Sequence, residues 1–272
     1  MRRTVFAIGV TSLLAALIYV GSFSFWLDRE IVDSENFLDS AVEALGTESS
    51  RDAIGQLIVD GLIEEFPLLT ILESNLVGMF SDLLASPALG DVVTLVGVNV
   101  HERIVTGNQD AIVIDLIDYR DVIVSPIEAV APRLAELIPD EWFASIEVLE
   151  AGVLPDLSTY AERVGLVRWV SLVGAFVLIA LLMWLVRRTT ATTLIGIAFV
   201  LAGVASAALV PAGRILTVAQ FEDRSVQTLS GNAYGVFVQP LLVGAAVLVL
   251  IGISVIVAGV ALGASDDDGQ AS

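Results

Sequence analysis

The amino-acid sequence predicts an all-α membrane protein, in which four transmembrane helices carry an acidic, mostly helical extracytoplasmic domain. A helix needs about 20 apolar residues to cross a bilayer, and four stretches are long enough. These stretches are Val5–Trp26, Leu166–Val186, Ala191–Pro211 and Phe237–Gly263. Hydrophobic residues make up 56% of the chain and the mean hydropathy is +0.84, which are values too high for an ordinary soluble domain.

The charge and the cysteine count exclude several classes of function. Asp and Glu number 32 against 13 basic residues, all of them Arg, so the formal net charge is −19. Nucleic-acid binding needs a basic surface, and we therefore expect no nucleic-acid partner. The chain has no Cys, which excludes a disulfide framework, a thiolate metal site and a thiol nucleophile.

The first domain, residues 1–26, is expected to be a short cytoplasmic end followed by an uncleaved anchor. Arg2 and Arg3 precede the apolar stretch, as they also would in a secretory signal. However, the stretch is longer than a typical signal core and no Ala-x-Ala-like site follows it. Its last residues, Gly21–Trp26, are rich in aromatic side chains and are typical of an interfacial border.

Arginine placement predicts the orientation. Arg2 and Arg3 precede the first span, and Arg187 and Arg188 lie in the short turn between the second and third. The positive-inside rule places both clusters in the cytoplasm. We therefore expect a multi-pass protein of the plasma membrane, with both termini cytoplasmic and residues 27–165 extracytoplasmic.

Residues 27–165 form the second predicted domain, and helix signals recur along its first half. Asp33 or Ser34 is expected to cap a helix that Gly46 ends, with Phe37, Leu38, Ala41, Val42 and Leu45 on one face. Ser49 or Ser50 is expected to cap a second, which carries Ile54, Leu57, Ile58, Leu62 and Phe66 and stops before Pro67. A third helix is predicted over Leu68–Ala85 and a fourth over Leu89–Thr106, ended by Gly107. Their apolar faces are long enough together to bury a core.

The second half of this domain has a different pattern. Ala111–Asp115 and Ser145–Leu149 are short and rich in β-branched residues, which favours a small two-stranded ribbon, although the same residues also fit buried helix ends. Between them, Ile127–Leu137 is predicted to be a helix ended by Pro139. Leu154–Glu162 is predicted to be a short helix that leads into the second span.

The third domain, residues 166–263, holds spans two to four, with an outer loop at 212–238 that is long enough to pack on the outer domain. Residues 264–272 are expected to be a disordered cytoplasmic tail. No Asp, Glu, Lys or His interrupts the spans and the one Arg, Arg168, lies at an end of its span, whereas ion and proton paths need such groups within the spans. Small side chains recur in the third and fourth spans and favour close helix packing over a pore lining: Ala198, Ala202, Ser206, Gly244, Gly252 and Gly259.

The outer domain offers a few candidate site residues, for each of which we favour a structural role. His101, the one histidine, is expected to lie on a helix face and bond a carboxylate rather than act as a pH-sensitive contact or metal ligand. Asp115, Asp118 and Asp121 recur every third residue, near Asn108 and Asp110, and calcium prefers such oxygen ligands. Without a calcium-binding loop, a solvated acidic face is the favoured interpretation. Asp266–Asp268 resembles half of such a loop but lies in the tail.

Neither catalysis nor a cofactor is predicted. The many Asp and Glu residues leave room for the paired carboxylates of a glycoside hydrolase, yet nothing in the sequence selects one pair. Trp142 and Phe143 are an aromatic pair that suits a core anchor better than a partner contact. We therefore predict no catalytic, cofactor-binding or metal-binding residues.

Three segments carry a resemblance to known proteins: Leu27–Phe37 directly after the first span, Val100–Gly107, and Ile112–Leu116. In these segments and in its layout the chain resembles a group of uncharacterised prokaryotic integral membrane proteins, notably of actinobacteria. The resemblance implies an architecture of one N-terminal span, a large extracytoplasmic helical domain and C-terminal spans. It implies no activity.

The leading functional hypothesis is therefore a non-enzymatic membrane protein whose outer domain serves interaction, sensing or envelope assembly. Its expected partners are the lipid bilayer and a protein in the membrane or envelope. The alternative is an accessory subunit of a transporter or channel, in which a partner supplies the polar path. A surface hydrolase that uses carboxylates or calcium is the least favoured class.

Overall fold

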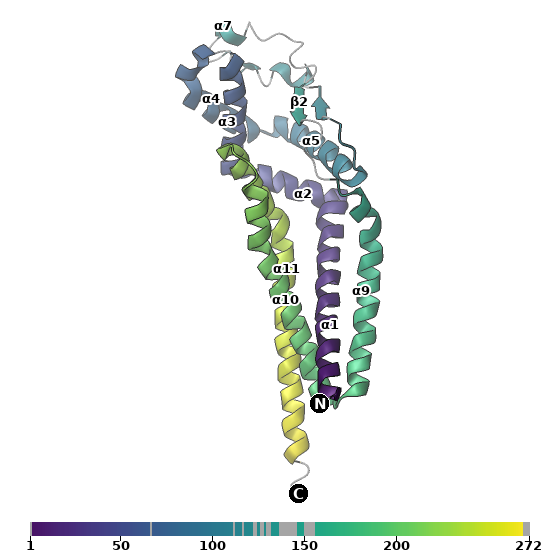
Figure 1. Ribbon diagram of the computed structural model, residues 1–272. Helices are drawn as coiled ribbons and strands as arrows, with labels where there is room; N and C mark the ends of the chain where they lie inside the picture. Colours follow the sequence, from purple (N-terminus) through teal and green to yellow (C-terminus); the bar gives the residue numbers. More distant parts are fainter. Residues whose placement is uncertain are drawn as a thin grey trace. The chain divides into compact units, whose positions relative to one another are not determined.

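The computed structural model is mainly helical, and four of its helices are long and apolar enough to cross a membrane, as expected of a multi-pass membrane protein (Figure 1). The chain folds into two compact units. Unit 1 comprises Met1–Glu30, Tyr160–Leu216 and Val238–Ser272, and unit 2 comprises Ile31–Thr159 and Thr217–Phe237. The structure describes residues 2–65, 67–110, 112–115, 117–121, 124–125, 128, 132–135, 146–149 and 156–268.

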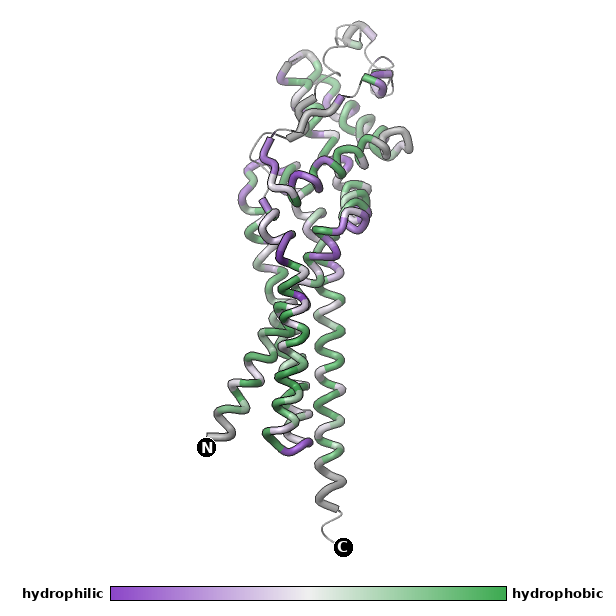
Figure 2. Tube along the Cα trace, turned by 90° about the vertical axis from the view of Figure 1, so that its right-hand side faces the viewer, coloured by the Kyte–Doolittle hydropathy of each residue, from purple (hydrophilic) through white to green (hydrophobic). Residues whose placement is uncertain are grey.

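Each candidate spanning helix is longer than the apolar stretch that predicted it. The helices are α1 (Arg2–Leu27), α9 (Ser158–Leu185), α10 (Arg188–Val218) and α11 (Arg224–Asp268). A five-residue π-helical segment, η1 (Asp28–Val32), directly follows α1. Figure 2 shows that hydrophobic residues dominate these helices, with hydrophilic ones near their ends.

The third domain and the tail contain more helix than expected. The outer loop expected at 212–238 is largely helical, because α10 continues past Pro211 to Val218 and α11 already begins at Arg224. Likewise, α11 continues to Asp268, five residues into the tail predicted to be disordered; residues 269–272 lie outside the described part. The short helix expected over Leu154–Glu162 to lead into the second span is continuous with that span, because α9 begins at Ser158; Leu154 and Pro155 lie outside the described residues.

Large and small side chains interlock in the core of unit 1. Leu14 of α1, Leu182 of α9 and Ala198 of α10 are each 0% exposed and belong to one buried cluster. Ala202 and Ser206 of α10 are buried as well, so the packing role expected of this small-residue face is confirmed.

Helices α10 and α11 approach each other backbone to backbone through glycines. A Cβ added to Gly196 would lie 2.6 Å from the Gly252 carbonyl oxygen, and one added to Gly203 would lie 2.6 Å from the Ala245 carbonyl oxygen. The two contacts are seven residues apart on each helix: Gly203 follows Gly196 on α10, and Ala245 precedes Gly252 on α11. Seven residues is the repeat of an apolar seam between packed helices. Gly259 continues the seam against Thr193, whereas a Cβ added to Gly244 would meet nothing within 4 Å. The packing role expected of Gly244 is therefore wrong.

Unit 2 begins with two helices that have defined ends. Helix α2 spans Ser34–Leu45, with Asp33 as its N-cap and Gly46 as its C-cap, as predicted. Helix α3 spans Glu48–Glu65, so Ser49 and Ser50 lie inside it rather than at its cap. The cap contact comes from Thr47, whose hydroxyl oxygen accepts from the Ser50 backbone N–H at 3.2 Å.

The helix predicted over Leu68–Ala85 is interrupted. Pro67–Leu72 forms the 3₁₀ segment η2, and α4 follows over Glu73–Leu84. Helix α5 then spans Pro87–Thr106, with Pro87 in its first turn. It ends at Gly107, whose φ of 73° is the left-handed conformation that favours glycine.

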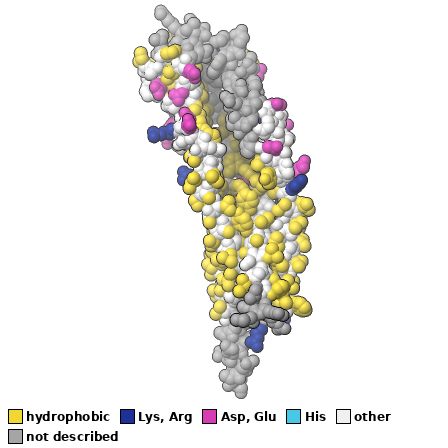
Figure 3. Space-filling view, in the orientation of Figure 1, with side chains coloured by type: hydrophobic (Ala, Val, Ile, Leu, Met, Phe, Trp, Pro, Cys, Tyr) yellow, Lys and Arg dark blue, Asp and Glu magenta, His cyan; other side chains and the backbone are white. Residues whose placement is uncertain are grey.

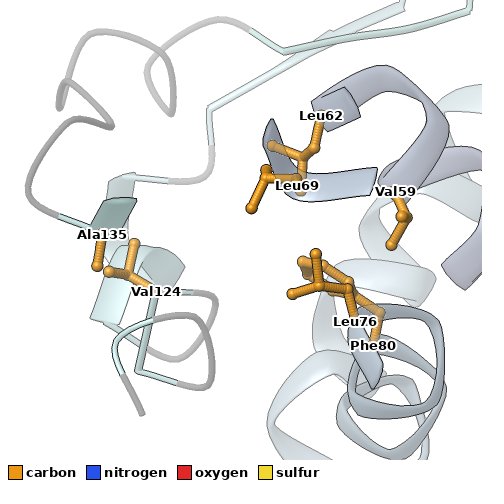
Figure 4. Close-up of a cluster of buried hydrophobic side chains, with 7 residues drawn as sticks. All are labelled: Val59, Leu62, Leu69, Leu76, Phe80, Val124 and Ala135. Carbon is orange, nitrogen blue, oxygen red and sulfur yellow. The ribbon is translucent and has the colours of Figure 1, made fainter. Parts of the chain in front are cut away.

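The core of unit 2 lies mainly between α3, η2 and α4. Figure 4 shows the side chains of α3 and η2 facing those of α4, with a further pair beside them. The cluster comprises Val59, Leu62, Leu69, Leu76, Phe80, Val124 and Ala135. On α3 the fully buried positions include Ala53 and Val59, whereas Ile54, Leu57 and Ile58 of the predicted face are only partly buried. On α2, similarly, Val42 is exposed and Ala44 is buried.

A short ribbon follows α5. Strand β1 (Ile112–Ile114) pairs antiparallel with β2 (Ile146–Leu149), and the register shifts between Ile112 and Val113. These strands lie within the two segments whose composition favours a ribbon. Between them are η3 (Ile117–Tyr119) and α7 (Pro132–Ala135). Most of the helix predicted over Ile127–Leu137, like Phe66, Trp142 and Phe143, lies outside the described residues.

Candidate functional site

Helix α2 carries a regular acidic surface in unit 2. Glu35, Asp39 and Glu43 recur every fourth residue and are all exposed. Residues four apart in a helix lie on the same face, which here is opposite the buried Phe37 and Ala44. Like charges at this spacing repel each other, so an isolated α2 would be weakened by its own acidic face.

The opposite face of α2 is held by an aromatic stack. The Phe37 ring lies 5.0 Å from the His101 ring of α5 and 5.2 Å from the Phe237 ring of α11, measured between ring centroids. Offset aromatic contacts at such distances favour one arrangement of the rings. The stack thus fixes which face α2 presents outward.

His101 has a structural role within this stack, although not the expected partner. Its Nε2 lies 3.0 Å from the carbonyl oxygen of Val32, so the hydrogen bond goes to the backbone at the end of η1 and not to a carboxylate. A carbonyl oxygen only accepts, and this contact therefore places the proton on Nε2. The His101 ring of α5 is half-buried against Phe37 of α2. It belongs to no group of three or more His, Cys, Asp or Glu residues that could hold a metal ion in the described part of the chain.

A polar network ties the turn after α2 to the beginning of α11. The side-chain amide of Asn232 donates to the hydroxyl oxygens of Ser49 at 2.8 Å and Ser50 at 2.9 Å. Ser50 is 1% exposed, and its hydroxyl in turn donates to the Ala44 carbonyl oxygen at 2.7 Å. Thr217–Phe237, which lies between the last two candidate spanning helices, belongs to the same unit as Ile31–Thr159.

The cap of α2 has an altered acidity. The backbone N–H of Asn36 donates to Asp33 Oδ1 at 3.0 Å and its side-chain amide donates at 2.9 Å, and these bonds hold the pKa of the Asp33 carboxyl below its usual value. At the start of α9, the hydroxyl and then the backbone N–H of Ser158 lower the pKa of Asp156 in the same way. Asp33 is the N-cap of α2, and Asp156 accepts from Ser158, the first residue of α9.

The candidate calcium ligands make local contacts. Asp115 Oδ1 accepts from the Ile117 backbone N–H at 2.9 Å, and Asp121 pairs with the neighbouring Arg120 at 3.3 Å. Asn108 Oδ1 accepts from the Asp110 backbone N–H at 2.9 Å. In the described residues, no group of three or more His, Cys, Asp or Glu side chains is arranged to hold a metal ion. Of Asp266–Asp268 the structure describes only the helical backbone.

A second cluster of charged groups lies at the end of α1, within Leu27–Phe37, a segment that carried a resemblance but predicted no site. Asp28 of η1 forms an ion pair with Arg168 of α9, which is 140 residues away in the chain. Glu30 is only 5% exposed and lies 3.6 Å from Arg29 Nε. π-Helical turns occur often at functional sites, because the extra residue redirects side chains. Here the turn places charged groups within the helical continuation of the first span.

Two cavities adjoin this end of α1. The first, of about 560 Å³, has an almost wholly apolar lining that ends at Arg168. The second, of about 460 Å³, contains Arg29, Glu30 and Gln239 in its wall. Ser22 and Phe25 line both cavities. Such volumes lie within the range of ligand pockets in proteins.

Comparisons with known proteins do not assign a function to these sites. The chain matches no protein-family model, and neither the curated proteins nor the solved structures contain a match. The resemblance to prokaryotic membrane proteins with one anchor and C-terminal spans therefore stays a prediction. Any function of these sites must accordingly follow from the chemistry of their residues.

Proposed function

We propose that this protein is a multi-pass plasma-membrane protein that displays an acidic helical domain outside the cell and binds a cationic protein partner through α2. In this topology both termini are cytoplasmic, as the arginine distribution predicts. The protein has no enzymatic role in this proposal and acts as an interaction module of the envelope.

The observation that carries the proposal is the acidic face of α2. Glu35, Asp39 and Glu43 are exposed and mutually repulsive, while His101, Phe237 and Asn232 hold the helix and its flanking turn rigidly enough to present that face. A basic partner would relieve the repulsion and gain long-range attraction, which raises association rates. Partner binding thus accounts for a charge pattern that does not stabilise the helix itself.

The spans support an anchoring role. Dark blue and magenta side chains are sparse on the visible apolar face of the helices of unit 1 in Figure 3. By sequence, no Asp, Glu, Lys, Arg or His lies within 169–186, 189–213 or 225–265. Charged paths for ions or protons need such residues. Close glycine packing of α10 on α11 fits a fixed anchor.

Photo-crosslinking in intact cells tests the proposal. A photoreactive amino acid replaces Asp39, and the cross-linked partner is identified by mass spectrometry. We expect one dominant basic protein, whose capture falls with rising salt. The triple variant E35Q/D39N/E43Q, assayed by co-purification of that protein, should lose binding at least tenfold.

The matched control removes three other exposed acids of unit 2 in the variant E64Q/D82N/E102Q, with the same change in net charge. This control should bind normally. Equal loss of binding in both triple variants would mean that the net charge of the protein, and not the acidic face of α2, determines binding. Failure to capture any partner through α2 would contradict the proposal.

A further inference from the structure

The larger of the two cavities described above has a polar end and an apolar remainder. It lies along α1 and α9, with one residue each from α10 (Phe199) and α11 (Leu248). Most of its wall is formed by aliphatic and aromatic side chains. The polar groups of the wall are Arg168, Ser22 and Ser171, and all three belong to the end of the cavity near the charged cluster.

Ser171 is the most informative of these residues. It is 3% exposed and lines the cavity, yet its hydroxyl makes no hydrogen bond to any residue that the structure describes. Other buried hydroxyls of the spans behave differently: Thr11 donates to the Ala7 carbonyl oxygen at 2.9 Å, and Ser206 donates to the Ala202 carbonyl oxygen at 3.0 Å. Ser171 Oγ is not one of the fully buried side-chain atoms without a partner, which among the described residues are Arg51 Nε and Ser86 Oγ. A hydroxyl that lines a cavity and has no protein partner can instead bond a ligand that enters the cavity.

Arg168 adds further donors at the same end. One of its terminal nitrogens pairs with Asp28, and a guanidinium has five N–H groups in all. Ser22, Ser171 and Arg168 are thus donors placed around the mouth of an apolar space. This set is complementary to a ligand with an acceptor-rich head and a hydrocarbon tail.

The spacing along α9 gives the order of the ligand's parts. Arg168 and Ser171 are three residues apart, a rise of about 4.5 Å, and the wall continues from Ser171 to Ile179, a further rise of about 12 Å. The strongest donor therefore comes first, then a hydroxyl, then a long apolar wall. A glycerophospholipid presents its phosphate, its ester carbonyl and its acyl chain in this order.

We propose that this cavity is a binding site for one glycerophospholipid. The acyl chain lies along the apolar wall between α1 and α9, the ester oxygens accept from Ser171 and Ser22, and the phosphate accepts from Arg168. Such binding requires only that these helices lie in a bilayer. The lipid site shares no residue with the acidic face of α2, so either proposal can fail while the other stands.

Native mass spectrometry of the purified full-length protein tests the site. The protein is stripped of lipid in detergent and then incubated with palmitoyl-oleoyl phosphatidylglycerol. We expect one lipid to remain bound per chain. The variant Leu172→Trp fills the cavity from its wall and should reduce retention at least tenfold. Val173→Trp is the matched control, because Val173 is exposed on the same helix and does not line the cavity.

A gentler variant keeps the test valid if the tryptophan disturbs folding. Ser171→Ala removes one hydrogen bond and should lower retention about fivefold, as expected for roughly 1 kcal/mol. Ser254→Ala, which removes a hydroxyl bonded to the Leu250 carbonyl oxygen, should change nothing. Failure of the wild type to retain lipid, equal loss in the control variants, or equal retention of free palmitate would overturn the proposal.

Discussion

Replacing Gly252 by Ala tests the glycine seam between α10 and α11. The added Cβ would lie 2.6 Å from the Gly196 carbonyl oxygen, 2.7 Å from Val200 Cγ2 and 2.8 Å from the Val200 backbone nitrogen. Ordinary contacts of a Cβ begin at 3.4 Å, so the two helices must separate locally by about 0.8 Å. Overpacking of this kind costs about 1–3 kcal/mol.

The matched control is Gly244→Ala on the same helix. A Cβ at Gly244 would meet nothing within 4 Å. Both substitutions stabilise the helix by about 1 kcal/mol through the higher helix propensity of alanine. The difference in stability between the two variants therefore measures the cost of the close contact at Gly252. We expect Gly252→Ala to be less stable than Gly244→Ala by about 2 kcal/mol.

Unfolding of the purified protein in mixed micelles, followed by circular dichroism, measures this difference. For a chain of this size, about 2 kcal/mol corresponds to a melting temperature about 4–8 °C lower. Equal stability of the two variants would refute the close contact, since helices with room between them tolerate either methyl group. A more stable Gly252→Ala would refute it more strongly.

Three further perturbations address unit 2. Gly107→Ala should destabilise it by about 1–2 kcal/mol in chemical unfolding, because φ is 73° and the new Cβ would lie 2.6 Å from Asp156 Oδ1; unchanged stability would contradict the left-handed cap. Asn232→Ala should cost about 1–3 kcal/mol, whereas Gln220→Ala, which loses one exposed bond to the Thr217 carbonyl oxygen, should cost little; equal losses would exclude the network. The lowered pKa of Asp33 means that its cap stabilises α2 fully above the ordinary value of 3.8 and stops doing so as pH falls through the lowered value. Asp33→Asn keeps a hydrogen-bond acceptor at the cap that does not titrate. The protection of the peptide that contains Asn36 against hydrogen exchange should therefore fall less at low pH in this variant than in the wild type.

Local sequence signals predicted several helix ends of unit 2. Asp33 acts by a side-chain acceptor and Gly107 by its tolerance of the left-handed conformation, whereas Gly46 ends α2 in a right-handed conformation. The four spans were equally visible, because hydrophobic length is a property of the segment itself. These features need no knowledge of distant contacts.

Features that depend on distant partners were missed. Small residues every fourth position predicted a packing face, but the seven-residue register of Gly196 and Gly203 on α11 follows from the antiparallel pairing of two helices. The Asp28–Arg168 pair joins residues 140 apart, and the cavity beside it arises only when α1 and α9 are placed together. The extension of α10 past Pro211 was missed because the apolar stretch stops there and a proline usually ends or kinks a helix.

The absence of cysteine makes the side of the membrane on which unit 2 lies directly measurable. Ile71, which is 88% exposed in η2, is replaced by Cys in one variant, and Arg188 is replaced by Cys in another. Intact cells are then treated with a membrane-impermeant maleimide. The proposed topology predicts labelling of Ile71→Cys in intact cells and labelling of Arg188→Cys only after permeabilisation. The reverse pattern, or labelling of both variants in intact cells, would contradict it.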